Sequence, residues 1–278
     1  MREKEISLSV YSMKILVKRE LISSLYGWGF YVAIFISFLI SSFILKNFLQ
    51  GIREENIFIS SYPLNFPLFV SVVIISFYLV VVSAISISRE REQGTLEILF
   101  YGPVSFSSFL LGKYITDMLL YLIILCFFAL YFLGVSVLTN LGFTLALAKA
   151  FLVSIFLASC MVSFGLFISS LTGRVRSSVI WLIGIILAFL AIWFLQNIFL
   201  NLPSEALSSW LRYLQKTLGI VSHFVRWISP FSYLSRGMES IRVGSIKPLL
   251  LNILYSLIYT TVLLVLSVYI LKAKGART

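Results

Sequence analysis

Charge is what this sequence has least of. Only 12% of its 278 residues are charged, 60% are apolar, and the mean hydropathy is +1.01. A soluble globular chain is usually about a quarter charged. An apolar excess of this size, gathered in runs of about 20 residues or more, is typical of an all-α integral membrane protein.

Residues that bind metals or perform catalysis are also scarce. The chain has one histidine, His223, and two cysteines, Cys126 and Cys160, which both fall inside apolar runs. We interpret the histidine as a surface or packing residue and the cysteines as small core residues. No paired carboxylates, histidine cluster or nucleophile with a base lies at one membrane depth, which argues against a membrane enzyme. We therefore expect this chain to bind no cofactor and no metal.

A phosphate-binding loop of the form G-x-x-x-x-G-K-[ST] is absent from the sequence. Gly112 and Lys113 come nearest, but Ser107 stands where the first glycine belongs and Tyr114 follows the lysine. If ATP drives this protein, a partner chain must bind it. The 22 basic residues outnumber the 11 acidic ones, yet no aromatic-rich surface domain exists to bind nucleic acid. The basic residues instead indicate loops that face the cytoplasm.

What the sequence does contain is six apolar runs. Each can cross about 30 Å of hydrocarbon as a helix that rises about 1.5 Å per residue. No internal repeat or low-complexity linker divides the chain, so residues 1–278 are expected to form one domain. The six runs are 27–45, 64–87, 114–138, 151–171, 179–200 and 249–271.

The third run has the least clean start. Lys113 and Asp117 lie one helical turn apart there, and we expect them to form a local i, i+4 ion pair near the interface. A proton-relay role for Asp117 is the alternative, since ionisable groups inside membranes are often functional.

Residues 1–25 are expected to form an amphipathic helix before the first span. Apolar residues recur there at steps of four and three, with basic residues beside them. Such a helix lies along the inner leaflet surface, although a solvated leader with chance periodicity is an alternative. The apolar residues are Ile6, Val10, Met13, Val17 and Leu21, and the basic ones are Lys14, Lys18 and Arg19.

Lysine and arginine are distributed unequally between alternate flanks of the spans. If the N-terminus is inside, the cytoplasmic segments are 1–26, 88–113, 172–178 and 272–278. These carry thirteen basic residues, whereas the short external flanks 46–63 and 139–150 carry three. Because positive residues favour the cytoplasmic side, we expect a multi-pass protein of the plasma membrane with both termini in the cytoplasm.

The long external segment 201–248 has the pattern of two helices. Steps of four and three predict a helix that starts near Ser204 and is broken at Ser229-Pro230. Its apolar stripe comprises Leu207, Leu211, Leu214, Leu218, Val221, Val225 and Ile228. Pro230 would open a second helix and Gly244 would end it. The stripe of that second helix comprises Leu234, Met238 and Ile241. This hairpin is expected to lie on or dip into the outer leaflet, or to pack over the helix ends.

Small residues recur four positions apart in the fourth and fifth runs. This spacing lets helix backbones approach closely in a membrane. Packing within the chain and a subunit interface are the two alternatives. The pairs are Ser159/Ser163, Gly165/Ser169 and Gly184/Ala188.

The segment 89–113 differs most from its surroundings, because it places charge, glycine, proline and serine between two apolar runs. Leu96, Leu99 and Phe100 share one helical face, and Gly102-Pro103 would end the helix. A short helix with charged ends and an apolar middle suits docking into a groove of another protein. An interfacial loop in contact with lipid headgroups is the alternative.

This segment resembles the first cytoplasmic loop of ABC-2-type transporter permeases. The matching residues are Glu90, Arg91, Glu92, Gly94, Thr95, Leu96, Glu97, Pro103, Val104, Ser105, Gly112 and Lys113. The sequence KREL at 18–21 and SPF at 229–231 also resemble the family's amphipathic helix and its external re-entrant segment. In that family the loop is the coupling helix, which sits in a cleft of the nucleotide-binding subunit.

The resemblance implies a transporter of two permease chains and two ATPase chains, with ATP and Mg²⁺ bound by the ATPase. It implies export by alternating access, while the cargo stays open. Leu96 and Leu99 are the expected anchors in the ATPase. A secondary transporter or channel without an ATPase is the rival, although charges deep in the spans are nearly absent. The candidate coupling interface comprises Glu90, Arg91, Glu92, Gly94, Thr95, Leu96, Glu97, Leu99, Phe100 and Pro103.

Overall fold

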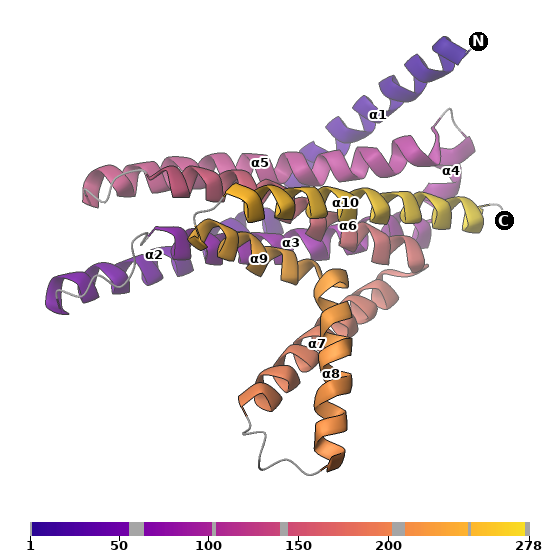
Figure 1. The fold of residues 1–278 in the computed structure, drawn as a ribbon. Helices are drawn as coiled ribbons and strands as arrows, with labels where there is room; N and C mark the ends of the chain where they lie inside the picture. The colour runs from indigo at the N-terminus through magenta and orange to yellow at the C-terminus, as the bar shows by residue number, and fades with distance from the viewer. Residues whose placement is uncertain are drawn as a thin grey trace.

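Ten helices follow one another in the part of the chain that the computed structural model describes, which is 2–55, 64–101, 104–139, 144–201, 209–243 and 246–275. No strand occurs within these ranges. The helices, drawn in Figure 1, are α1 (Arg2–Leu25), α2 (Trp28–Glu55), α3 (Asn65–Glu92), α4 (Thr95–Tyr101), α5 (Phe106–Thr139), α6 (Leu145–Leu171), α7 (Val175–Asn201), α8 (Ser209–Ile228), α9 (Pro230–Val243) and α10 (Ile246–Gly275).

Six of these helices are long and apolar enough to cross a membrane, which confirms the six-span prediction. They are α2, α3, α5, α6, α7 and α10. Each of them extends beyond its apolar run at one end or both. α3 continues through the charged residues to Glu92, and α5 begins at Phe106, two turns before the run that starts at 114. Helical hydrogen bonding thus continues where hydropathy alone would end a span.

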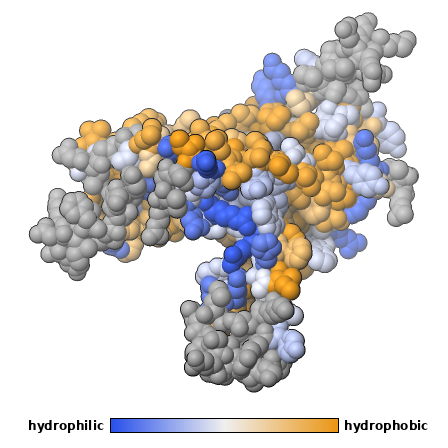
Figure 2. Space-filling model, viewed as in Figure 1, coloured by the Kyte–Doolittle hydropathy of each residue, from blue (hydrophilic) through white to orange (hydrophobic). Residues whose placement is uncertain are grey.

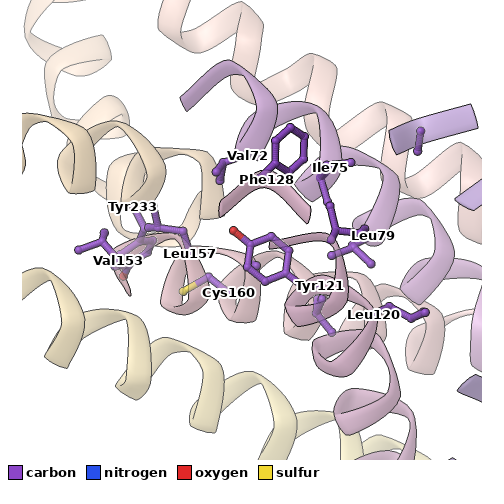
Figure 3. Close-up of a cluster of buried hydrophobic side chains, with 14 of the residues drawn as sticks. Val72, Ile75, Leu79, Leu120, Tyr121, Phe128, Val153, Leu157, Cys160 and Tyr233 are labelled. Carbon is purple, nitrogen blue, oxygen red and sulfur yellow. The ribbon is translucent and has the colours of Figure 1, made fainter. Parts of the chain in front are cut away.

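α6 is the centre of the bundle, and it packs against α3, α5, α7, α9 and α10. Side chains from several helices converge on it in Figure 3, where Leu79 and Tyr121 are drawn together with Leu157 and Cys160. Ala158, Cys160 and Leu166 are completely buried. This interior excludes both water and lipid, so its packing is what fixes the positions of the surrounding spans.

The small residues of α6 serve packing within the chain. A Cβ added at Gly165 would lie 2.7 Å from both the Ser83 Cβ and the Val80 carbonyl oxygen of α3. The Ser169 Oγ accepts hydrogen bonds of 3.0 Å from the backbone N–H groups of Ile87 and Ser88. On α7, by contrast, a Cβ added at Gly184 would meet no atom of another helix within 4 Å.

The two cysteines differ in their environments. Cys160 is buried and donates to the Ser256 carbonyl oxygen at 3.5 Å, so the prediction of a core residue is confirmed there. For Cys126 the prediction is wrong, because this residue lies on the exposed face of α5. In a membrane span an apolar run does not separate core positions from lipid-facing ones.

α1 uses one face to pack against α5. A Cβ at Gly112 of α5 would lie 3.7 Å from both Leu16 and Met13 and 3.9 Å from Val17. Leu16, which is not among the residues of the predicted apolar face, is the most buried of these at 6% exposure. The half-buried side chains Met13, Val17 and Leu21 lie where the stripe predicts. The side chains of Ile6 and Val10 are outside the described residues.

The hairpin predicted for 201–248 is present as α8 and α9, from Ser209 onward. Pro230 begins α9 as predicted. α8 is a strongly amphipathic helix, as its stripe predicts. Within that stripe Val225 is half-buried, whereas Val221 and Ile228 are exposed. The positions Ser204, Leu207 and Gly244, and the side chains of Leu211, Leu214 and Leu234, lie outside the described residues.

α7 and α8 project away from the other helices, whereas α9 lies along the bundle (Figure 1). α9 packs on α6 and α10. A Cβ at Gly237 would be 3.0 Å from Val153 of α6, so this glycine allows the close approach. Because α7 projects from the bundle, it has the smallest buried share of the six spans.

Candidate coupling interface

α4 begins at a tight turn that follows α3. The Gln93 N–H donates to the Arg89 carbonyl at 3.0 Å and the Gly94 N–H to the Arg91 carbonyl at 3.1 Å. Gly94 has a φ of +70°, which a glycine adopts without the steric cost of a Cβ. The Thr95 Oγ1 then donates to the Glu90 carbonyl at 3.1 Å. These bonds fix the direction in which α4 leaves the span.

The apolar residues of α4 divide between an inner and an outer face. Leu96 is only 7% exposed and belongs to the core of this chain. Phe100 packs on Phe106 of α5, with 4.1 Å between the ring centroids. Ile98 and Tyr101 point outward, with 71% and 92% of their surfaces exposed. The expectation that Leu96 anchors a partner is therefore wrong, because its side chain is already used to seat α4 on its own bundle.

Behind α4, Lys113 of α5 is shared by two carboxylates from distant helices. Its Nζ lies 2.7 Å from the Glu20 Oε1 of α1 and 2.9 Å from the Glu90 Oε1 of α3. The Lys113 side chain is only 4% exposed. The predicted local pair of Lys113 with Asp117 is wrong, because the ammonium turns toward α1 and α3 instead.

The charges of this cluster oppose the cost of burying it. Burial raises the pKa of the Glu20 carboxyl above its ordinary value of 4.5, even though the Lys113 ammonium lowers it. Arg19 adds a second cation 3.9 Å from the Glu90 Oε1, but it is largely exposed. Two carboxylates and one buried ammonium thus hold together α1, α3 and α5.

Asp117 lies one turn further along α5 and is also buried. Its Oδ2 accepts a hydrogen bond of 2.5 Å from the Ser83 Oγ of α3. Ser83 is also the residue that approaches Gly165 of α6. Asp117 is therefore part of the α3–α5–α6 packing.

Charged side chains also tie the end of α3 to the turn between α6 and α7. The Arg91 Nη1 donates to the Thr172 carbonyl at 3.1 Å, and the Lys274 Nζ donates to the Leu171 carbonyl. The Glu92 Oε2 accepts from the Val175 N–H at 2.9 Å. Cations thus meet the C-terminus of α6 and an anion meets the N-terminus of α7, the arrangement that helix dipoles favour.

Two cavities flank α4. One of about 440 Å³ lies toward α10 and is lined by Arg91, Glu97, Tyr101 and Lys274, among others. The other, also of about 440 Å³, is lined by Arg19, Glu90, Gln93, Thr95, Ile98 and Leu99. α4 therefore forms a ridge between two cavities that charged residues line.

The structure brings together most of the predicted site residues. Glu90, Arg91 and Glu92 bind neighbouring helices, while Thr95 and Glu97 stay exposed. Pro103 lies outside the described residues. The sequence analysis did not single out Ile98 and Tyr101. They are the apolar residues of α4 that remain for the outer face once Leu96, Leu99 and Phe100 are assigned to the inner one. Glu20 was missed as a partner of Lys113, and only its presence in KREL drew attention to it.

Comparison with known proteins places these features in a family. No curated protein matches the chain. The profile of the ABC-2 family transporter proteins matches residues 54–269, which is most of the chain and includes α3, α4 and α5. Six membrane-spanning helices accompany the match. The chain therefore belongs to the ABC-2 family of transporter proteins.

Proposed function

We propose that this transport permease is driven by a separate ABC ATPase that docks on α4, and that it exports its substrate. ABC-2 permeases associate in general with such an ATPase. The observation that carries the proposal is the outer face of α4, where Ile98 and Tyr101 are exposed on a helix whose inner face is fixed. Exposed apolar side chains on an otherwise charged end suit burial in a partner.

Motion of α4 would reach several spans at once. α4 is joined to α3 by the turn at Gly94, and it packs on α5 through Phe100 and Phe106. The Lys113 cluster in turn links α3 to α5. α7 is connected through the bond from Val175 to Glu92. An ATPase that binds α4 differently in its two nucleotide states would shift the equilibrium between two permease conformations, which is alternating access. ATP and Mg²⁺ would be bound by the ATPase, with no cofactor on this chain.

The same proposal sets the orientation in the plasma membrane. In Figure 1 the N-terminus, the C-terminus and α4 lie at one end of the bundle. The basic flanks of the spans favour a cytoplasmic location for this end. A second permease chain would complete the pathway, and the exposed apolar surfaces of α7 and α10 suit either that chain or lipid.

Replacing the exposed residues of α4 tests the docking. Ile98→Asp and Tyr101→Asp place a charge where a partner would bury an apolar group. Loss of one such anchor costs about 2 kcal/mol or more, which is roughly 30-fold in affinity. We expect the ATPase that co-purifies with the wild-type permease to be lost from both variants, and ATP-driven transport in reconstituted vesicles with it.

Ile98→Leu is the matched control, because it keeps an apolar side chain at the same position and should retain the ATPase. Leu96→Asp should instead lower the amount of folded permease, since that side chain is internal. If no ATPase co-purifies with the wild type, or if both aspartate variants retain it, the docking proposal is wrong.

A further inference from the structure

A cleft between the projecting helices has no role in the coupling described above. It holds about 340 Å³ and lies among α7, α8, the first turns of α9 and Phe77 of α3. This volume is within the range of about 300–1,000 Å³ that small-molecule sites occupy. Its walls are mainly apolar and aromatic, and include Ile186, Phe189, Trp193 and Phe231.

One side of the cleft is polar. Ser222 and Arg226 lie four positions apart, so they share the face of α8 that lines the cleft, and Ser229 follows directly after this helix. Ser232 and Ser235 continue this polar edge along α9. Figure 2 shows hydrophilic side chains gathered over α9, near the place where α8 meets the bundle. The cleft therefore combines an apolar interior with a hydroxyl-rich rim.

Arg226 gives this rim its charge. It is the sole charged residue among the described side chains that line the cleft, and no carboxylate is among them. Within the described residues, the ion pairs of the chain involve Arg19 and Lys113, not Arg226. The guanidinium of nearby Arg236 is stacked on Trp227, 4.6 Å from the ring centroid, and does not line the cleft. A single guanidinium beside hydroxyl groups suits a phosphate or carboxylate group.

We propose that this cleft binds one anionic lipid of the surrounding bilayer, with an acyl chain between Phe189 and Trp193 and the negatively charged headgroup on Arg226. The apolar walls favour a ligand that has an acyl chain, and the guanidinium favours a negative headgroup over a zwitterionic or cationic one. Because α7 is a membrane span, a lipid can reach the cleft laterally from the bilayer. This site is independent of ATPase docking on α4, since the two share no residue.

Photolabelling of the purified permease in neutral detergent tests the site. The probe is lysophosphatidylglycerol with a diazirine in its acyl chain, and lysophosphatidylcholine with the same chain is the comparison. We expect the anionic probe to label peptides of α7 and α8 saturably, and the zwitterionic probe to label them at about tenfold higher concentration. Both probes carry a phosphate, so this factor reflects the choline cation of the zwitterionic probe, which opposes the guanidinium.

Matched variants distinguish the contribution of the headgroup charge from that of the acyl chain. Arg226→Gln should raise the half-saturating concentration of the anionic probe about tenfold and abolish the preference between the two probes. Arg176→Gln removes the same charge from the other end of α7 and should leave both values unchanged. Trp193→Ala should reduce labelling, whereas Trp181→Ala, an equally exposed tryptophan of α7 outside the cleft, should not.

Three results would overturn the proposal. Labelling spread evenly over α5, α7 and α10 would indicate bulk lipid. An unchanged half-saturating concentration in Arg226→Gln would remove the headgroup contact. Cross-links between two permease copies through Trp193 and Val225 would show that a second chain, not a lipid, fills the cleft.

Discussion

At the scale of single residues, the Lys113 ammonium is the point at which α1, α3 and α5 are held together. Its visible neighbour is Asp117, four positions away, yet its ammonium binds Glu20 and Glu90, which are 93 and 23 positions away. The sequence marks Glu20 and Glu90 as members of two motifs but does not pair them with Lys113, because the pairing depends on how α1 crosses α5. Leu16 was missed for the same reason, since its burial comes from contact with Gly112.

The Lys113 cluster should be costly to break from one side only. Lys113→Met leaves two carboxylates without their cation in a buried place, which costs about 3–5 kcal/mol. We expect a clear loss of thermal stability in detergent. Adding Glu20→Gln and Glu90→Gln to the same chain should restore much of the stability, because the unpaired charges are gone.

Lys272→Met is the control, since it removes an exposed lysine at the same end and should change the melting temperature little. A Lys113→Met variant as stable as this control would show that the three groups are not coupled. A triple variant less stable than Lys113→Met would contradict the charge-based explanation.

At the scale of helices, hydropathy and turn residues predicted most of the elements. Six spans, a short helix between Gly94 and Pro103, and a helix opened by Pro230 follow from run length and from glycine and proline positions. The orientation of each helix about its axis could not be predicted. Leu96 and Ile98 are both apolar, and only the packing of α4 on α5 shows which one is internal.

The contact between α3 and α6 should tolerate no side chain at Gly165. A Cβ there would meet the Ser83 Cβ and the Val80 carbonyl oxygen at 2.7 Å, so Gly165→Ala must push two helices apart. Overpacking of this kind costs about 1–3 kcal/mol. We expect a lower melting temperature and a smaller yield of monodisperse protein.

Gly184→Ala supplies the comparison, because a Cβ at that position of α7 meets nothing within 4 Å. Both changes raise helix propensity equally, so the difference between them isolates the helix–helix contact. Equal stability of the two variants would contradict the close approach of α3 and α6.

At the scale of the whole molecule, the topology is the main prediction. Thr95 and Tyr213 are exposed and lie on α4 and α8. Single cysteines at these positions, in a background without Cys126 and Cys160, should react oppositely with a membrane-impermeant thiol reagent in intact cells. We expect labelling of Tyr213→Cys from outside, and of Thr95→Cys only after the membrane is opened.

Labelling of Thr95→Cys in intact cells would place α4 outside and reverse the orientation.

The sequence supports this topology through its basic flanks, whereas the separation of α7 and α8 from the bundle could not be predicted. Their apolar faces look the same in sequence whether they meet protein or lipid, so the cleft around Arg226 becomes visible only when the helices are placed.

The shared lysine also sets an order of events during synthesis. Glu20 leaves the ribosome 93 residues before Lys113 does, which corresponds to roughly 5 to 20 s at 5–20 residues per second. During that interval α1 has neither its contact with Gly112 nor its cation. It must wait on the membrane surface, where exposed Tyr11, Ile15 and Ile22 can keep it bound to lipid. The first helix to be made is thus seated only after the start of α5 has been made.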